Sequence, residues 1–308
     1  MPAPRAAVDV GSNSVRLLVL DGDGARRTRI MRITRLAAGV DATGHLDDAA
    51  LARTLEVIAG YHEVWREHGV TDRVRIAATS AVRDAADRHR FFDGVHAATG
   101  VRAQVITGDE EAGLAFAGAV GAVDVPRPTV VLDIGGGSTE LIVGDGQGAV
   151  AAATSMQLGC VRVAERHLAH DPPSASELLA ARELIETQLD EGTRLLAERG
   201  GDLASAQAMV AVAGTATTLG AIHLGLDSYD EDRIHGARLP AEALGELTAR
   251  LVAMTAAERA KLGAVQPGRE DVIHGGALVL QAALARTGLD EVVISEADGL
   301  DGLAASLG

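Results

Sequence analysis

The chain has 308 residues, of which 47% are hydrophobic and 2% aromatic, and its formal net charge at pH 7 is −15. This length suits one large or two medium domains, with a core built from Ala, Val, Leu and Ile. The acidic balance argues against a nucleic-acid partner. The single cysteine, Cys160, excludes an internal disulfide and a CxxC metal site, which is typical of a protein in a reducing cytosol.

The sequence also lacks features of membrane or secreted proteins and of one common class of phosphate site. No apolar stretch reaches the length of a transmembrane span, and the N-terminus has no signal-peptide core, so we expect a cytoplasmic protein with no membrane partner. Lys261 is the only lysine among 28 basic residues and follows Ala260, which excludes a Walker-type Gly-Lys-Ser/Thr loop. Any phosphate must therefore be bound by arginine, glycine backbone and metal.

In chain order, the first segment that carries chemistry is Val8–Val19 (VDVGSNSVRLLV). An apolar strand delivers Asp9 to a turn, and a second strand carrying Arg16 follows. Glycine leaves backbone N–H groups unshielded and hydroxyl side chains add donors, so the turn suits an anion. The turn consists of Gly11, Ser12, Asn13 and Ser14.

The next segments predict alternating strands and helices. Arg26–Arg35 is typical of a strand with a solvated arginine face, and His45–Gly69 predicts a helix. The buried strand Val74–Ala78 then runs into Thr79–Ala86 (TSAVRDAA). Hydroxyls and helix N–H groups at the carboxyl end of a strand favour ligand binding, and Arg83 lies in the first turns of that helix.

A run of acids opens the helix within Thr107–Ala119 (TGDEEAGLAFAGA), and Glu111 belongs to it. Acids complement the dipole at a helix N-terminus, so decoration of the helix and a functional role both stay open. Two prolines in Asp124–Pro128 indicate a linker. We therefore expect domains over 1–125 and 126–298, with a C-terminal helix at about 299–308 packing back on the first domain.

The strongest signal is Val130–Val143 (VVLDIGGGSTELIV), where Asp133 and Glu140 border a glycine-rich turn. Carboxylates at this place can hold a metal ion beside phosphate. An ordinary glycine-rich hairpin is the alternative, although such hairpins rarely place this run between two acids. The segment repeats the plan of Val8–Val19, which indicates a duplicated architecture whose turns clamp a phosphate chain. The turn consists of Gly135, Gly136, Gly137, Ser138 and Thr139.

The remaining sequence supplies a third phosphate-compatible turn. In Met209–Gly225 an apolar strand meets a helix start that carries Gly214, Thr215 and Thr217. The polar stretch Asp227–Arg238 is either a lid or a surface loop. A further helix is expected to begin at Arg269–Asp271.

With these turns in place, the chain resembles the Ppx/GppA family, the exopolyphosphatases and guanosine pentaphosphate phosphohydrolases of the actin/hsp70/sugar-kinase superfamily. The resemblance covers nearly the whole chain and rests on the ordered motifs DVGSNSVRLL, TSAVRDA, TGDEEA, LDIGGGSTEL, GCVR, AGTATTL and GREDVIHGG. It implies an α/β fold of two ribonuclease-H-like domains with a cleft between them. Within the family, the chain is similar to the short two-domain exopolyphosphatases of high-GC Gram-positive bacteria.

The resemblance also implies roles for individual residues. Glu111 matches the proposed catalytic carboxylate that activates the attacking water, pointing from the first domain into the cleft. Arg83 and Arg16 match arginines that bind the phosphoryl group, and the three turns match phosphate-binding loops. Asp133 and Glu140 match acids near the metal and the nucleophile.

The implied metal is Mg²⁺ or Mn²⁺, held by Asp133 and Glu140, with Asp9 as a further candidate ligand. The implied reaction is hydrolysis of the terminal phosphoanhydride of short-chain inorganic polyphosphate, which releases orthophosphate. Hydrolysis of pppGpp is the nearest alternative, because both substrates present the same phosphate end. A kinase-type phosphotransferase and a non-catalytic polyphosphate or alarmone sensor are more distant alternatives. A homodimer is implied by the resemblance alone.

The chain departs from the family pattern near its C-terminus. The family's GLREG reads Gly299-Leu300-Asp301-Gly302, so the expected arginine is replaced by Asp301. No helical extension follows Gly308, and we therefore do not expect processive degradation of very long polyphosphate.

Overall fold

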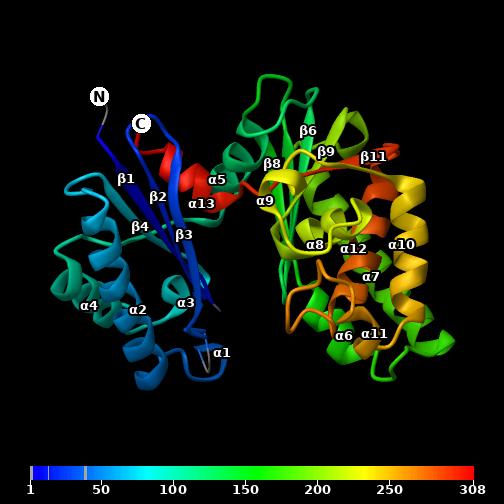
Figure 1. The fold of residues 1–308 in the computed structure, drawn as a ribbon, viewed down its shortest axis with the longest axis horizontal. Helices are drawn as coiled ribbons and strands as arrows, with labels where there is room; N and C mark the ends of the chain where they lie inside the picture. Colours follow the sequence, from blue (N-terminus) through cyan, green and yellow to red (C-terminus); the bar gives the residue numbers. More distant parts are fainter. Residues whose placement is uncertain (1–2, 13, 38–39) are drawn as a thin grey trace. The chain divides into compact units, whose positions relative to one another are not determined.

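The computed structural model describes residues 3–12, 14–37 and 40–308, and its contacts divide the chain into two compact units (Figure 1). Unit 1 comprises Met1–Gly118 with Gly299–Gly308, and unit 2 comprises Ala119–Asp298. Each unit has its own sheet and its own core. None of the described helices is long and apolar enough to cross a membrane.

The sheet of unit 1 has five strands in the order β3-β2-β1-β4-β5. The first three pair antiparallel, whereas β4 and β5 continue the sheet parallel to β1. The strands are β1 (Arg5–Val10), β2 (Ser14–Leu20), β3 (Arg26–Ile33), β4 (Val74–Ala78) and β5 (Gln104–Val105). The last strand, β5, is short because residues 101–106 pair with β4 only at Gln104 and Val105.

Helices cover both faces of this sheet. Alternate residues of a strand point to opposite faces, so Leu17 packs in the core beneath α2 and α4, while Leu18 packs with Leu300 and Leu303 of α13. The helices are α1 (Val40–Thr43), α2 (Asp48–Glu67), α3 (Ser80–Asp84), α4 (His89–Thr99), α5 (Gly108–Gly121) and α13 (Gly299–Ala305).

Gly302 and Asp301 hold the C-terminal helix α13 close to its neighbours in unit 1. A Cβ on Gly302 would lie 2.0 Å from the carbonyl oxygen of Leu114 in α5, so the contact requires glycine. Asp301 accepts a hydrogen bond from Nη1 of Arg29 at 2.8 Å. The carboxylate at position 301 therefore ties α13 to strand β3.

The sheet of unit 2 repeats the same plan with one strand added, in the order β10-β11-β9-β6-β7-β8. Strands β6, β7 and β8 pair antiparallel, and β9 and β11 extend the sheet parallel to β6. The strands are β6 (Thr129–Ile134), β7 (Thr139–Gly144), β8 (Val150–Met156), β9 (Ala208–Val212), β10 (Arg238–Pro240) and β11 (Glu291–Ile294). The repeat is the duplication that the two hairpin motifs predict.

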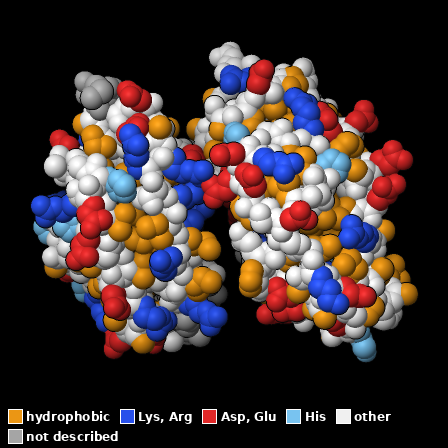
Figure 2. Space-filling view, in the orientation of Figure 1, with side chains coloured by type: hydrophobic (Ala, Val, Ile, Leu, Met, Phe, Trp, Pro, Cys, Tyr) orange, Lys and Arg blue, Asp and Glu red, His pale blue; other side chains and the backbone are white. Residues whose placement is uncertain are grey.

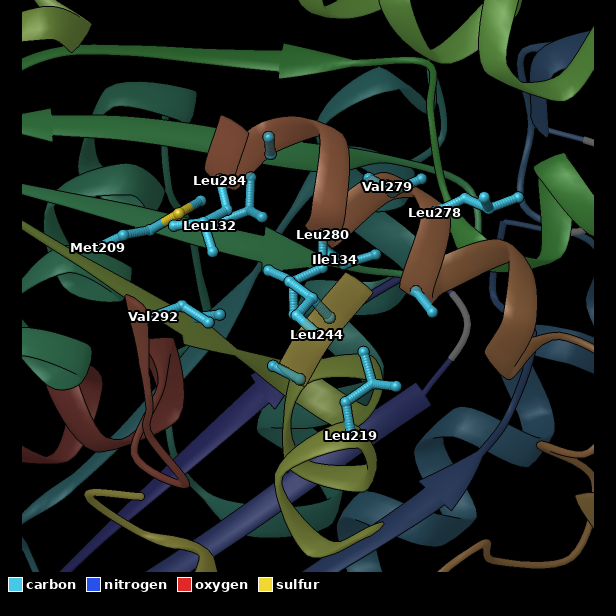
Figure 3. Packing of buried hydrophobic residues seen from close by; sticks show 14 of the residues in the cluster. Leu132, Ile134, Met209, Leu219, Leu244, Leu278, Val279, Leu280, Leu284 and Val292 are labelled. Carbon is cyan, nitrogen blue, oxygen red and sulfur yellow. The ribbon is translucent and has the colours of Figure 1, made fainter. Parts of the chain in front are cut away.

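The core of unit 2 lies between this sheet and a layer of helices. Figure 3 shows Leu280 and Leu284 of α12 beside Ile134 and Leu132 of β6, and all four belong to one buried cluster. The helices are α6 (Cys160–His167), α7 (Ala175–Glu198), the 3₁₀ helix η1 (Leu203–Ser205), α8 (Ala213–His223), α9 (Glu231–Ile234), α10 (Ala241–Ala253), α11 (Ala256–Arg259) and α12 (Ile273–Thr287).

Helix α12 begins at Ile273, after the start at Arg269–Asp271 that the sequence predicts. Gly268 has φ +86°, and its N–H donates to the side chain of Glu270 at 2.7 Å. The carbonyl of Arg269 then accepts the N–H groups of Val272 and Ile273. Residues 260–272 thus form a series of turns, and Arg269 lies outside the helix.

Candidate active site

The two hairpin turns close in the same way. The N–H of Gly11 donates to the carbonyl of Ser14 at 2.9 Å, and the N–H of Gly135 donates to the carbonyl of Ser138 at 3.0 Å. Ser12 and Ser14 lie in or beside the first turn, half-buried, whereas Asn13 lies outside the described residues. The duplicated motif therefore folds into duplicated local geometry.

The charged residues that flank each turn lie directly opposite one another. Asp9 is paired with Arg16 across β1 and β2, and Oδ2 of Asp9 accepts from Nη2 and Nε of Arg16 at 2.7 and 3.0 Å. In unit 2, Asp133 occupies the equivalent position and faces Glu140 across β6 and β7. Residues directly opposite in such a ladder have Cβ atoms about 5 Å apart. One hairpin thus carries an ion pair, and the other carries two acids.

The glycine run of the second turn is oriented by helix α6. The carbonyls of Gly135 and Gly136 accept the N–H groups of Cys160 and Val161, both at 3.0 Å, and the carbonyl of Gly137 accepts from Nε of Arg162 at 2.8 Å. In a trans peptide the N–H points opposite to the carbonyl. The N–H groups of residues 136–138 therefore point away from α6, on a turn whose two central glycines are exposed.

Close approach to α6 depends on Gly159, which precedes this helix. A Cβ there would lie 2.3 Å from the carbonyl oxygen of Gly136. Thr139, which the sequence groups with the turn, is fully buried, and its hydroxyl donates to the carbonyl of Leu158 at 2.5 Å. The turn therefore presents backbone N–H groups outward while Thr139 anchors its base.

Glu140 lies in an environment that favours its protonated form. Burial raises the pKa of its carboxyl, a rise that hydrogen bonds from Ser155 and Ser138 reduce, and the Ser155 hydroxyl donates to Oε1 at 2.7 Å. Among residues 3–12, 14–37 and 40–308, no group of three or more His, Cys, Asp or Glu side chains is placed to hold a metal. Asp133 and Glu140 still fit Mg²⁺, which commonly uses one or two carboxylates together with substrate phosphate and water.

The third turn joins β9 to α8 through a strained residue. Ala213 has φ +64°, a left-handed conformation that is costly for a residue with a Cβ and that is often found at functional sites. Thr215 and Thr217 follow, and both are buried. Thr215 is hydrogen-bonded to Cys160, whose pKa is raised by burial, and Thr217 is hydrogen-bonded to Tyr229.

Arg269 joins this turn, although the sequence motifs do not single it out as a site residue. A Cβ on Gly214 would lie 1.6 Å from Nη1 of Arg269, so the guanidinium rests directly on the glycine backbone. Its positive charge acts on both Cys160 and Tyr229. The signal for it in the sequence is its place as the arginine of the GREDVIHGG motif.

In unit 1 the structure brings Arg83 and Glu111 together. Nη1 of Arg83 lies 3.7 Å from Oε2 of Glu111 and donates to the carbonyl of Ile106 at 3.1 Å. Glu111 lies in the first turn of α5, where its N–H donates to the carbonyl of Thr107. Both side chains are partly exposed, at 34% for Arg83 and 45% for Glu111, so they can be reached by a ligand.

The visible surface does not divide into faces of one charge. Figure 2 shows acidic and basic side chains interspersed on the face of each unit that it presents. The net charge of −15 is therefore not gathered in one acidic patch on this face (Figure 2).

Comparison with known proteins identifies the family. The model of the Ppx/GppA phosphatase family matches residues 26–304. The chain belongs to this family. It is 43% identical to Exopolyphosphatase 2 of Mycobacterium tuberculosis over 98% of both chains. It is also 34% identical to a guanosine-5'-triphosphate,3'-diphosphate pyrophosphatase of Vibrio atlanticus, over 61% of this chain and 38% of that protein.

Solved structures of the family confirm the fold class. The crystal structure of an Aquifex aeolicus Ppx/GppA phosphatase superposes with a TM-score of 0.87 at 27% identity and covers 99% of both chains. An exopolyphosphatase-like protein superposes with a TM-score of 0.84 at 37% identity, also over 99% of both chains. The predicted α/β fold of the actin/hsp70 kind, with two ribonuclease-H-like domains, is therefore confirmed.

Proposed function

We propose that the protein is an exopolyphosphatase, which hydrolyses the terminal phosphoanhydride of inorganic polyphosphate and releases orthophosphate. Similarity to Exopolyphosphatase 2 over nearly the full length of both chains supports this reaction. The observation that carries the proposal is the turn of residues 135–138. Its N–H groups point away from α6, beside Asp133 and Glu140, as a site for a phosphate with a bound cation requires.

Hydrolysis of a phosphoanhydride requires that the charge on the phosphate is neutralised and that the attacking water is oriented. In the proposed mechanism the N–H groups of the glycine turns bind phosphate oxygens, and Arg83, Arg16 and Arg269 add guanidinium donors. Asp133 and Glu140 would hold Mg²⁺ or Mn²⁺, with Asp9 as a further candidate, and the metal would supply charge neutralisation. The hydroxyls of Ser12, Ser14 and Ser138 belong to the same proposed phosphate-binding set. The hydroxyls of Thr215 and Thr217 are buried and bonded to Cys160 and Tyr229, so the third turn would contribute backbone N–H groups.

Glu111 is the proposed general base. Its carboxylate takes a proton from water, the water oxygen forms a bond to the terminal phosphorus, and the bridging P–O bond breaks. The products are orthophosphate and a chain shorter by one phosphate. Arg83, 3.7 Å from Glu111, would bind the transferred phosphoryl group while holding the carboxylate in place.

The second candidate is hydrolysis of pppGpp, favoured by the similarity to the Vibrio atlanticus enzyme. The proposed site acts on the phosphate end, and both substrates share that end.

We also propose that the protein acts in the cytosol as a homodimer. Size-exclusion chromatography with light scattering tests the oligomeric state.

Release of orthophosphate in Mg²⁺ from short polyphosphate, long polyphosphate, pppGpp and ATP tests the proposed function. Fastest turnover of short polyphosphate is expected. A clear preference for pppGpp would keep the mechanism and replace the substrate. No release from any of the four would favour a non-catalytic sensor.

A further inference from the structure

Arg259 is a buried arginine that the proposed chemistry does not use. It ends α11, its side chain is 2% exposed, and it is among the largest fully buried side chains of the described residues. Burial of a guanidinium is costly unless its donors are matched by acceptors. An apolar residue of similar volume often stabilises such a position as well or better, so what distinguishes an arginine here is the set of hydrogen bonds that its guanidinium makes.

Each donor group of Arg259 has an acceptor on a different segment. Nε donates to the carbonyl of Glu270 at 2.6 Å, and Nη1 donates to the carbonyls of Met254 and Leu251 at 2.6 and 3.2 Å. Nη2 donates to Oδ1 of Asp171 at 3.2 Å. The Asp171 carboxylate in turn accepts the N–H of Ala256 with both oxygens at 2.9 Å. Arg259 thus ties the end of α10 and the start of α11 to residue 270.

The tie to Glu270 falls next to the arginine that rests on the third turn. Arg269 lies in the series of turns between α11 and α12. Its backbone bonds are short-range: its N–H donates to the carbonyl of Gln266, and its carbonyl accepts from Val272 and Ile273. Its guanidinium lies against Gly214, where a Cβ would be 1.6 Å from Nη1. The residue after Arg269 is Glu270, and its backbone carbonyl is held by the buried side chain of Arg259.

We propose that Arg259 is a positioning residue, which fixes the carbonyl of Glu270 and thereby holds the Arg269 guanidinium on Gly214 for substrate phosphate. The inference rests on the proposed function for the role of Arg269. A guanidinium that is already oriented binds a phosphate oxygen at lower entropic cost than a mobile one. Without the hydrogen bond from Arg259 to Glu270, the Arg269 guanidinium could move away from Gly214 while the protein kept its positive charge.

The experiment is a double-variant cycle on the affinity for short polyphosphate, measured by calorimetry in a Glu111→Gln background, where hydrolysis should be slowed by a factor of about 10²–10⁴. The variants are Arg259→Lys, Arg269→Ala and the two combined. We expect each single change to weaken binding about tenfold and the combination to weaken it no further than Arg269→Ala alone, because removal of Arg269 leaves nothing to position. Arg250→Leu, an exposed arginine on α10, is the matched control and should leave the affinity unchanged.

A purely structural role would give a different result. Arg259→Lys would then weaken binding by the same factor with and without Arg269, and this additivity would overturn the inference. It would equally be overturned if Arg269→Ala left the affinity unchanged or if polyphosphate did not bind. If Arg259→Lys fails to fold, Asp171→Asn loosens the Nη2 contact from an exposed position, and the same cycle applies. Turnover by the wild type is assayed separately, so failure of the proposed function is distinguishable from failure of this inference.

Discussion

Nη1 of Arg83 lies 3.7 Å from Oε2 of Glu111. The two residues come from different elements, since α3 follows β4 and α5 follows β5. The same Nη1 donates to the carbonyl of Ile106, just ahead of the turn that starts α5. Arg83 is therefore tied to the segment that carries Glu111.

This geometry predicts a graded response at position 83. Arg83→Lys keeps the charge but loses the planar fork, so kcat/KM for short polyphosphate should fall about tenfold, and Arg83→Gln should lower it about a hundredfold or more. Arg102→Gln, an exposed arginine of the same unit, is the control. Equal activity of the wild type and Arg83→Gln would show that Arg83 does not bind the substrate phosphoryl group.

The glycine turn of unit 2 can be displaced without changing any polar side chain. Gly159→Ala places a Cβ 2.3 Å from the carbonyl oxygen of Gly136, so the turn must shift by about 1 Å. A shift of this size at a phosphate site can lower activity about a hundredfold, and overpacking should lower the free energy of unfolding by about 1–3 kcal/mol. Both are measured against Gly146→Ala, where a Cβ meets no atom within 4 Å. Unchanged kcat/KM in Gly159→Ala would show that the turn does not bind substrate.

The environment of Glu140 predicts how the metal requirement depends on pH. Burial raises the pKa of its carboxyl, and the Ser155 hydroxyl lowers it in part. A proton competes with a cation for this carboxylate, so the Mg²⁺ concentration for half-maximal activity should rise as pH falls, beginning above the ordinary range of glutamate. Chelation should abolish turnover and Mg²⁺ should restore it.

Two variants check this assignment. Ser155→Ala removes a donor to the carboxylate, so it should move the pH dependence of the Mg²⁺ requirement to higher pH. Glu140→Gln should raise the Mg²⁺ requirement at least about tenfold and flatten its pH dependence. Activity is measured as a function of Mg²⁺ concentration at several pH values. A Glu140→Gln curve that overlays the wild-type curve would exclude Glu140 as a metal ligand.

His274 should make unit 2 sensitive to acid. Its ring is 2% exposed, and burial, followed by the charge of Arg259, lowers its pKa to about 4. Because the unfolded chain binds the proton more tightly, the stability due to neutral His274 is complete above its unfolded pKa of 6.5 and is lost as pH falls toward 4. The loss amounts to about 3 kcal/mol.

Urea unfolding from pH 7 to pH 4 measures this loss. The free energy of unfolding of the wild type should fall more steeply than that of His274→Gln, which has no group to titrate there. Because the carboxylates are the same in both proteins, the difference between the two plots of unfolding free energy against pH isolates the contribution of His274. Parallel curves would contradict the assignment.

The two hairpins could be predicted from the sequence because residues close together in the chain determine each of them. An acid at the end of an apolar strand, a glycine and hydroxyl turn, and a second strand determine the register, and the structure pairs Asp9 with Arg16 and Asp133 with Glu140. The capping box of Ser174 and Glu177 at the start of α7 is likewise a local pattern, and the structure contains it.

Contacts between distant segments could not be predicted in this way. Arg269 reaches Gly214 only because α12 packs closely against α8, where a Cβ on Gly276 would lie 2.5 Å from Thr215. The carbonyl of Glu270, in the turns before α12, is likewise held by a distant residue, Arg259 of α11. The buried hydroxyl of Thr139 shows that a residue inside a binding motif can serve the interior instead.

The most direct test of the proposed mechanism compares Glu111→Gln with Glu110→Gln in release of orthophosphate from short polyphosphate. The two glutamates are adjacent in the first turn of α5, but Glu110 pairs with Arg75 whereas Glu111 lies beside Arg83. Glu111→Gln should lower kcat by a factor of about 10²–10⁴, as expected for loss of a general base, while Glu110→Gln should keep nearly full activity. Equal activity of the two variants would contradict the assignment of Glu111 as the base.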